Sequence, residues 1–449
     1  MSKDIRIKKG LDIKLVGEAE KNTTDISLSS VYAVKPEDFH GIIPKLVAKE
    51  GAEVKAGDTL FYSKGDERIL FPSPVSGKVV EVIRGARRKV LTVKIAADTT
   101  QVYKDFGTKN ADIMSAEEVK CHLFTSGCWP FVKQRPYDVV ASPNQAPKAI
   151  FISAYASAPL AADLDYTLAG KEAELQAAVT AISKLTEGKV HVSVAANSNS
   201  PLSGLKGIEL HKVSGPHPSG NVSTQIAQID PINKGEVVWV VNPQDLIVIG
   251  ELFLTGKLNV TRTIALTGSQ FSKPQYVTAI AGATVSDITA NNLEDNNTRI
   301  ISGNVLSGKE VKADEFLGYY DNQITAIPEG NDYEFFGWNK PIFNKISASR
   351  ALTFSWLTPK KKYDLNTNTN GEHRAFVVTG SYEQVFPLDI YPMQLLKAFM
   401  YKDLDEMEAL GGYEVAPEDF ALTEFICVSK QPHQQIIREG LDLMREELG

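Results

Sequence analysis

The chain has 449 residues, of which 43% are hydrophobic and 23% charged, so it is an ordinary globular sequence with material for several cores. A net charge of −7 without a long basic stripe argues against a nucleic-acid partner. Three cysteines, Cys121, Cys128 and Cys427, give neither a disulfide framework nor metal-ligand spacing, which suits a reducing compartment. The most apolar window, 237–254, contains polar and charged residues and cannot lie in hydrocarbon.

Residues 44–83 contain two apolar half-motifs, one on each side of a short polar hairpin. The halves, Pro44–Leu60 and Phe71–Ile83, each have a glycine turn followed by strand-like alternation. In the second half, Val80 and Val82 alternate with a polar residue, which predicts a strand with one buried face. The pair of halves resembles the barrel-sandwich hybrid fold of biotinyl and lipoyl carriers.

The hairpin between the halves lacks the lysine that a carrier modifies. Counting strand lengths inward predicts that Glu67 and Arg68 stand at the tip, and Lys64 falls too early to replace them. We therefore interpret this module as a carrier fold reused for docking.

From residue 149 the pattern changes to alternating strands and helices. The predicted strands cover 149–153, 190–194 and 237–241. Two predicted helices have apolar faces, at Leu175, Val179, Ile182 and Leu185 and at Leu246, Ile249 and Phe253. This alternation predicts a parallel sheet with right-handed crossovers, a Rossmann-like layer.

An open parallel sheet binds ligands beyond the carboxyl ends of its strands, usually at a glycine-rich turn. The turn after the first strand, Ser153–Leu160, has no glycine, so we do not expect a dinucleotide cradle there. Two other glycine-bearing loops, 126–136 and 214–221, are interpreted as ordinary connecting loops whose glycines and prolines act as punctuation between elements. His217 is interpreted as a turn residue.

The residue pattern changes twice in the last third of the chain. Runs such as Thr261–Gly268 and Tyr276–Ile280 predict a small β-grasp unit, and from Pro387 the pattern is helical, with a final helix from about His433 to Leu448. The predicted fold is thus a multidomain α/β protein. Its expected units are an N-terminal arm with the barrel-sandwich hybrid (1–100), a Rossmann-like unit (101–256), a β-grasp, SLBB-like unit (257–345) and a C-terminal helical region (346–449).

This order of units resembles the A-subunit family of the Na⁺-translocating NADH:quinone oxidoreductase, over essentially the whole chain. The segments that carry the resemblance are Ile5–Ile13, Gln134–Pro136, Pro147–Phe151, Pro159–Asp163, Ser214–Pro218 and Pro387–Met393. The resemblance implies a peripheral subunit on the cytoplasmic face of the cell's inner membrane, with the other subunits as partners. The complex would be a sodium-transporting translocase of the respiratory chain that oxidises NADH and reduces ubiquinone, and the isolated subunit would not be catalytic.

The same architecture also resembles the flavin-bearing subunit of respiratory complex I, and the differences are informative. Those relatives hold the flavin phosphate on a glycine-dense loop, whereas this chain has the bulky Trp129–Phe131 there. They also hold an iron–sulfur cluster near their terminal helices, whereas this chain has Cys427 alone. We therefore expect no cofactor, metal or catalytic residue on this chain, with NADH, flavins, iron and Na⁺ handled by partner subunits.

The resemblance associates the chain with quinone as substrate. Trp129, Phe131, Tyr137 and Tyr155 offer an aromatic lining, and Arg135 can donate to a quinone carbonyl, so these five form the candidate quinone site.

Two other functions remain open: a stand-alone flavin- or NADH-binding dehydrogenase, and a lipoyl or biotinyl carrier. A visible absorption spectrum tests for the dehydrogenase, because bound flavin absorbs near ~450 nm. Intact mass separates the second, because a carrier has an adduct on one lysine.

Overall fold

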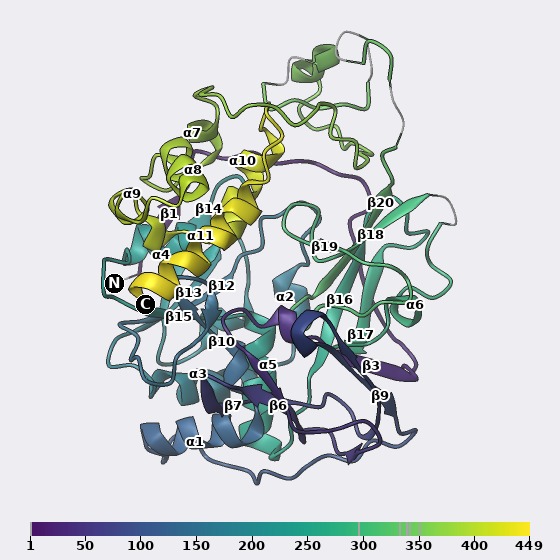
Figure 1. The fold of residues 1–449 in the computed structure, drawn as a ribbon, viewed down its shortest axis with the longest axis vertical. Helices are drawn as coiled ribbons and strands as arrows, with labels where there is room; N and C mark the ends of the chain where they lie inside the picture. Colours follow the sequence, from purple (N-terminus) through teal and green to yellow (C-terminus); the bar gives the residue numbers. More distant parts are fainter. Residues whose placement is uncertain (1, 295–296, 332–333, 338–339, 341–342, 350–351) are drawn as a thin grey trace.

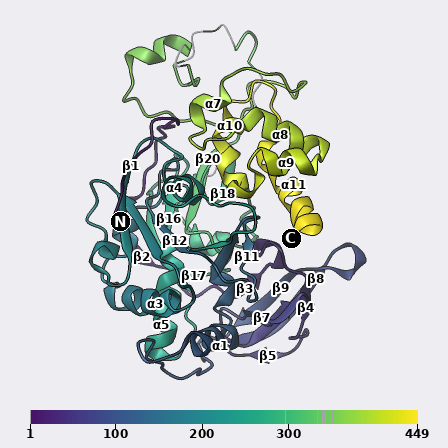
Figure 2. The same cartoon turned by 90° about the vertical axis from the view of Figure 1, so that its left-hand side faces the viewer.

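The computed structural model describes residues 2–294, 297–331, 334–337, 340, 343–349 and 352–449. These residues form four sheets and a C-terminal group of helices. The helices of the C-terminal group lie together beside the larger α/β unit, and the end of the last helix reaches the N-terminal β module, where Arg445 donates to the carbonyl of Gly41 (Figures 1 and 2).

The N-terminal module has two small sheets around one apolar core. The first has the order β3–β9–β8–β5, with bounds Val31–Val34, Val90–Ala97, Gly77–Arg84 and Glu53–Val54. The second has the order β4–β6–β7, with bounds Pro44–Leu46, Thr59–Ser63 and Asp66–Pro72. Phe61, Phe71 and Val93 are fully buried between them, as the alternation of the two half-motifs predicts.

Two details of this module differ from the prediction. The ladder between β8 and β9 has an irregularity between Val79 and Glu81, so Val80 is 47% exposed instead of sharing a buried face with Val82. Such a break in strict alternation depends on the partner strand and has no local signal.

The hairpin tip was also predicted wrongly. Ser63 pairs with Asp66, so the two-residue turn is Lys64–Gly65, while Glu67 and Arg68 lie within β7. A register shift between Tyr62 and Ser63 places the extra residues on β7, and counting strand lengths cannot anticipate it. The exposed lysine therefore does stand at the tip.

The α/β unit is built on a seven-stranded sheet. Its order is β1–β14–β13–β12–β15–β10–β11, with bounds Asp4–Arg6, Glu209–Ser214, Val190–Ala195, Ile150–Ala154, Val238–Val241, Val132–Arg135 and Val139–Val140. The first five strands are parallel, and β10 pairs antiparallel with both of its neighbours, β15 and β11. Its helices are α1 Ala116–Ser126, α2 Leu164–Thr167, α3 Glu172–Ser183, α4 Val222–Ile229 and α5 Pro243–Thr255. The predicted parallel strands and both predicted helices are confirmed.

Helices cover both faces of this sheet. Ile150 and Ile152 share a core with α3 and α5, while Phe151 points to the other face and packs under α4. The α3 and α5 backbones approach closely at Gly250, where a Cβ would lie 1.8 Å from the carbonyl oxygen of Glu174.

The N-terminal arm joins units that are far apart in the sequence. Strand β1 adds to the edge of the α/β sheet, and β2 (Glu20–Asp25) pairs in parallel with β17 (Gln275–Ile280) of the next unit. Between them Leu11 and Leu15 pack against Val385 and Leu422 of the C-terminal region.

The β-rich unit is a six-stranded mixed sheet. Its order is β19–β18–β20–β16–β17–β2, and its own strands are β16 Thr261–Thr267, β17 Gln275–Ile280, β18 Thr298–Ser302, β19 Lys309–Glu310 and β20 Gln323–Pro328, with the short helix α6 Val285–Ile288. The two strands predicted from sequence, β16 and β17, form its antiparallel hairpin.

The C-terminal region is helical, as predicted. Its helices are α7 Tyr382–Val385, α8 Pro392–Tyr401, α9 Leu404–Ala409, α10 Ala421–Phe425 and α11 His433–Leu448. Leu395, Phe399 and Leu441 form their shared core. Across the part of the chain that is described, we find no helix with the length and apolarity needed to traverse a bilayer.

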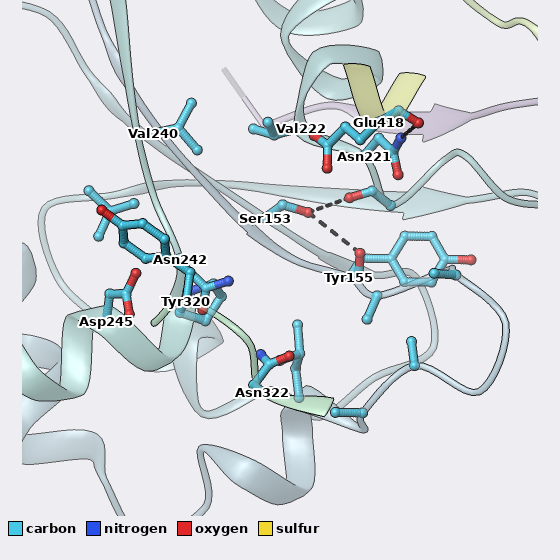
Figure 3. A pocket seen from close by; sticks show the side chains of 18 of the residues that line it. Ser153, Tyr155, Asn221, Val222, Val240, Asn242, Asp245, Tyr320, Asn322 and Glu418 are labelled. Atoms are coloured by element: carbon cyan, nitrogen blue, oxygen red, sulfur yellow. Dashed lines mark hydrogen bonds between the residues drawn. The ribbon is translucent and has the colours of Figure 1, made fainter. Parts of the chain in front are cut away.

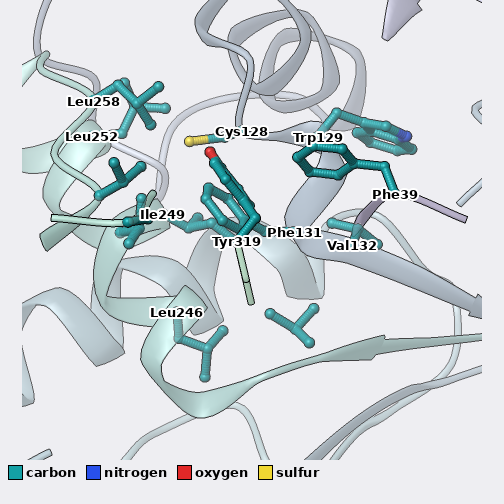
Figure 4. Close-up of a cluster of buried hydrophobic side chains, with 14 of the residues drawn as sticks. Phe39, Cys128, Trp129, Phe131, Val132, Leu246, Ile249, Leu252, Leu258 and Tyr319 are labelled. Carbon is teal, nitrogen blue, oxygen red and sulfur yellow. The ribbon is translucent and has the colours of Figure 1, made fainter. Parts of the chain in front are cut away.

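One apolar cluster joins the three β-containing units (Figure 4). Phe39 comes from the N-terminal module, Trp129 and Phe131 from the α/β unit, and Tyr319 from the β-rich unit. The Phe131 and Tyr319 rings are stacked with centroids 5.7 Å apart, and Phe39 lies 4.9 Å from Tyr319. The units therefore share a core instead of meeting at a polar interface.

A buried ion pair lies beside this cluster. Arg262 of β16 donates from Nη2 to Oδ1 of Asp245 in α5 over 2.6 Å, and the two side chains are 0% and 2% exposed. Burial raises the pKa of the Asp245 carboxyl above its usual value, while Arg262 counteracts the shift. The guanidinium carbon lies 5.8 Å from the centre of the Phe131 ring.

We expect Arg262→Met to lower the free energy of unfolding by about 3–5 kcal/mol, because it leaves a buried carboxylate without its partner. Urea denaturation at neutral pH measures the change. Removing both charges in Arg262→Met/Asp245→Leu should recover part of the loss.

The matched control is Arg299→Met, which breaks partly exposed pairs with Glu329 and Glu310 and should cost about 1 kcal/mol or less. Equal losses in the two single variants would contradict a special role for the buried pair.

Candidate functional site

A cleft of about 300 Å³ lies beyond the carboxyl ends of β12 and β15 (Figure 3). The chain proceeds from β12 to β13 on one side, whereas β15 flanks β12 on the other, so the strand order reverses here. Open α/β sheets bind ligands at such a reversal. Side chains from every part of the molecule except the N-terminal module line it, among them Phe131, Lys133, Arg135, Ser153, Tyr155, Asn221, Asn242, Asp245, Tyr320, Asn322 and Glu418.

Local capping signals position one wall of the cleft. β15 ends at Asn242, whose side chain accepts the N–H of Gln244, and Pro243 occupies the first helical position. Helix α5 therefore begins at the cleft, and its first turn presents Asp245 to it.

Arg135 is the central charge of the cleft. Its side chain is 5% exposed; Nη2 donates to Oε1 of Glu418 over 3.1 Å, and Nε lies 3.6 Å from Oδ1 of Asp138. Burial works against its charge, but Asp138 and Glu418 raise its pKa above the usual value. Among the described residues, Nε and Nη1 have no hydrogen-bond partner. A buried guanidinium with unused N–H groups is a donor site for a ligand oxygen.

Two of the predicted aromatic residues also line the cleft. Tyr155 lies in the glycine-free turn after β12, and its hydroxyl donates to the carbonyl of Gly215 over 3.0 Å. Phe131 forms part of the opposite wall with Tyr320, whose hydroxyl donates to the Pro130 carbonyl over 2.6 Å.

The other two predicted aromatic residues lie elsewhere. Trp129 is fully buried in the shared core and donates from Nε1 to the carbonyl of Ala141 over 2.8 Å. Tyr137 packs against Tyr413 and the C-terminal helices. Neither lines the cleft, because strand alternation holds only within β10: Trp129 lies in the helical turn before this strand, and Tyr137 lies after its end with a left-handed backbone (φ 78°).

Several residues of the cleft, among them Asn221, Tyr320 and Glu418, were not among the predicted site residues. The loops 126–136 and 214–221 were interpreted as punctuation, yet the first supplies the predicted Phe131 and Arg135 and the second supplies Asn221. Glu418 comes from the C-terminal region, 283 residues after Arg135. Their glycine and proline clusters were the available signal for the two loops, and we find no local signal for Glu418.

A second group of ligand-type side chains, His191, Glu209 and His211, lies on β13 and β14. The backbone N–H of Lys3 donates to Nδ1 of His211 over 3.1 Å, so neutral His211 has its proton on Nε2, which donates to Nδ1 of His191 over 3.0 Å. A metal ion would need the Nε2 lone pair, and Glu209 is already paired with Lys189. These residues fit a hydrogen-bond relay and do not fit a metal site.

Comparison with known proteins agrees with this architecture. Three family models match: "NqrA N-terminal barrel-sandwich hybrid domain" over residues 5–98, "NqrA second alpha/beta domain" over 114–258 and "NQRA C-terminal domain" over 263–313. The chain is therefore a barrel-sandwich hybrid joined to α/β and β-rich units, the class that its sheets define.

Full-length relatives make the assignment specific. The A-subunit of the Na(+)-translocating NADH-quinone reductase from Neisseria meningitidis serogroup B is 38% identical over 446 residues, which cover 99% of this chain and 100% of that protein. The corresponding protein of Pasteurella multocida is 35% identical over the same shares, and that of Haemophilus influenzae (strain PittGG) 36%. This chain belongs to the A-subunit family, NqrA, of the Na⁺-translocating NADH-quinone reductase, so it is part of a multi-subunit enzyme complex.

Among solved structures, an air-oxidised NAD⁺-reducing [NiFe]-hydrogenase matches with a TM-score of 0.35 and 11% identity, over 67% of this chain and 55% of that chain. A score this low does not bear on the fold.

Four buried histidines predict a pH dependence of stability. Burial lowers the pKa of His122, His211, His217 and His433 from the usual 6.5 to about 4. The unfolded chain therefore binds more protons than the folded chain between these values. We expect the free energy of unfolding to be highest above pH 6.5 and to fall as the pH drops toward 4.

Urea denaturation from pH 7 to pH 4 measures this slope. His122→Leu should flatten it, because His122 packs on Phe253 and has no partner at Nε2 among the described residues. The exposed His373 provides the control His373→Leu, and an unchanged slope in His122→Leu would contradict the prediction.

Proposed function

We propose that this chain is a peripheral subunit on the cytoplasmic face of the inner membrane, within the sodium-pumping complex, and that its cleft binds quinone. In this proposal the isolated chain is not catalytic. It binds no flavin or iron–sulfur cluster of its own, and partner subunits handle NADH, flavins, iron and Na⁺.

The unused donors of Arg135 are the observation that carries the quinone assignment. A quinone ring is flat and apolar with carbonyl oxygens at opposite ends, so it needs apolar walls and a donor. Phe131 and Tyr320 supply one wall, Tyr155 and Val240 line the same cleft, and Arg135 has two N–H groups left for a carbonyl. Trp129 and Tyr137 are not part of this proposed site, because they do not line the cleft.

The build of the cleft also favours this ligand over a flavin or a nicotinamide dinucleotide. We propose that the seven-stranded sheet is a Rossmann-like layer and the six-stranded sheet a β-grasp, SLBB-like unit, reused without their usual phosphate cradle. The turn after β12 has alanines, serines and a proline where a cradle needs glycine.

The alternative of a lipoyl or biotinyl carrier has one supporting feature, the exposed Lys64 at the hairpin tip. Measurement of the intact mass tests this alternative, because a carrier has an adduct on one lysine.

Attachment through partners is supported by one segment of exposed aromatic side chains. Phe335, Phe343 and Trp356 are 87%, 70% and 60% exposed, all within 22 residues that follow the last strand of the β-rich unit. Exposed aromatic residues are the anchors that protein interfaces bury. We propose that this segment docks on another member of the complex.

We expect the purified chain to bind a short-chain ubiquinone saturably. Phe131→Ala with Arg135→Ala should weaken that binding at least about tenfold, because the variant loses one wall and the donor. Quenching of intrinsic tryptophan fluorescence during the titration measures the affinity.

Tyr137→Phe is the matched control and should bind as the wild type does, since Tyr137 lies outside the cleft. Arg135→Lys provides a milder variant that keeps the buried charge. The quinone assignment would be contradicted if the wild type showed no saturable binding. It would also be contradicted if binding survived the double substitution.

We expect Phe335→Ser/Phe343→Ser/Trp356→Ser to reduce the amount of other subunits that co-purify with a tagged copy of this chain from solubilised membranes. The substitutions remove apolar anchors while leaving the folded units untouched. Quantitative mass spectrometry of the eluate measures the ratio.

The control for this experiment is Ile113→Ser/Tyr401→Ser, which changes two side chains that are equally exposed but lie in other units. An unchanged ratio in the triple variant, or an equal loss in the control, would place the docking surface elsewhere.

A further inference from the structure

The cleft has a corner whose chemistry suits an anion. Helix α4 begins there, and the first N–H groups of a helix have no partner within the helix. Arg135 lines the same cleft, and its side chain is 5% exposed. Among the described residues its Nε and Nη1 make no hydrogen bond, although Nε lies 3.6 Å from Oδ1 of Asp138. A helix N-terminus together with a buried guanidinium is a strong oxyanion site.

The capping residue of α4 leaves this helix end open. The side chain of Asn221 makes no capping hydrogen bond to the helix. Its amide instead donates to the carbonyl of Glu418 over 3.3 Å and to Oδ1 of Asp419 over 3.4 Å (Figure 3 shows Asn221 beside Glu418). The residue before it, Gly220, has no space for a side chain, because a Cβ would lie 2.3 Å from the Tyr155 carbonyl.

A carboxylate from the C-terminal region already occupies the corner. Oε1 of Glu418 accepts from Nη2 of Arg135 over 3.1 Å, and Glu418 is 41% exposed whereas Arg135 is 5% exposed. Glu418 can therefore turn into solvent at small cost, but the buried guanidinium cannot follow it.

The neighbouring carboxyl of Asp419 is buried. Burial, and next the charge of Glu418, raise the pKa of Asp419 to about 7, so at neutral pH it carries less than a full negative charge. Asp138 and Asp245 also line the cleft, but they face Arg135 and Arg262 respectively. Glu418 is then the side chain that decides whether the corner accepts an external anion.

We propose that this corner is an oxyanion-binding site with Glu418 as its built-in occupant, and that a ligand bearing a phosphate or carboxylate group binds by displacing Glu418 from Arg135. The Glu418 carboxylate would fill the position of a charged ligand while no ligand is bound. The sheet can therefore hold such a position at its strand reversal without a glycine-rich cradle. The inference goes beyond quinone binding and does not depend on it: both ligands would contact Arg135, but an oxyanion needs the charge of Arg135 and the start of α4, whereas a quinone ring also needs the aromatic walls.

The test is calorimetric titration of the full-length protein with inorganic phosphate, at constant ionic strength in a buffer without other oxyanions. Glu418→Gln keeps the size of the side chain and removes its charge, and we expect it to bind phosphate at least about tenfold more tightly than the wild type. Adding Arg135→Lys to Glu418→Gln should abolish most of the gain, since lysine lacks the guanidinium fork. Thermal denaturation of each variant verifies that it is folded.

Glu446→Gln is the matched control, because it removes the same charge from an exposed position near the end of α11. Equal phosphate affinity in the wild type and Glu418→Gln would overturn the proposal, and so would an equal gain in Glu446→Gln, which would indicate a net-charge effect. A separate titration of the wild-type protein with quinone measures quinone binding. The quinone assignment and the oxyanion assignment can therefore each be contradicted without the other.

Discussion

The ion pair between Arg262 and Asp245 is the constraint on which the cleft depends. Each charge comes from a different unit, and each is buried so deeply that it has no solvent to replace its partner. The pair therefore ties β16 to the start of α5 and keeps Phe131 between the units. With the stacked rings of Phe131 and Tyr319, it makes the α/β and β-rich units one body, so the wall of the cleft is rigid.

The cleft has the backbone geometry of a ligand site in an open α/β sheet, but different side chains fill it. The reversal of strand order between β12 and β15 is a place where open sheets bind ligands, and the start of two helices, α4 and α5, faces it. Aromatic side chains and a C-terminal carboxylate now occupy much of that space. A fold suited to holding a charged cofactor is thereby compatible with a flat, uncharged ligand, and Arg135 is the one group that either kind of ligand would contact.

Sequence patterns were reliable where a single element decides its own structure. The apolar faces of α3 and α5 and the final helix from His433 follow from local periodicity. They failed where a partner strand sets the register, as at the Lys64–Gly65 turn and at the exposed Val80. The arm shows the same limit, because nothing within residues 4–25 indicates that its two strands join two different sheets.

The amino-acid sequence by itself determined the family, the succession of units, and three of the five proposed site residues that meet in the cleft, Phe131, Arg135 and Tyr155. Only the tertiary structure decided that Trp129 and Tyr137 face the core and that Glu418 reaches Arg135. The reason is physical: periodicity and capping act over a few residues, whereas the direction of a side chain beside a loop, and its partner hundreds of residues away, are set by how complete units pack.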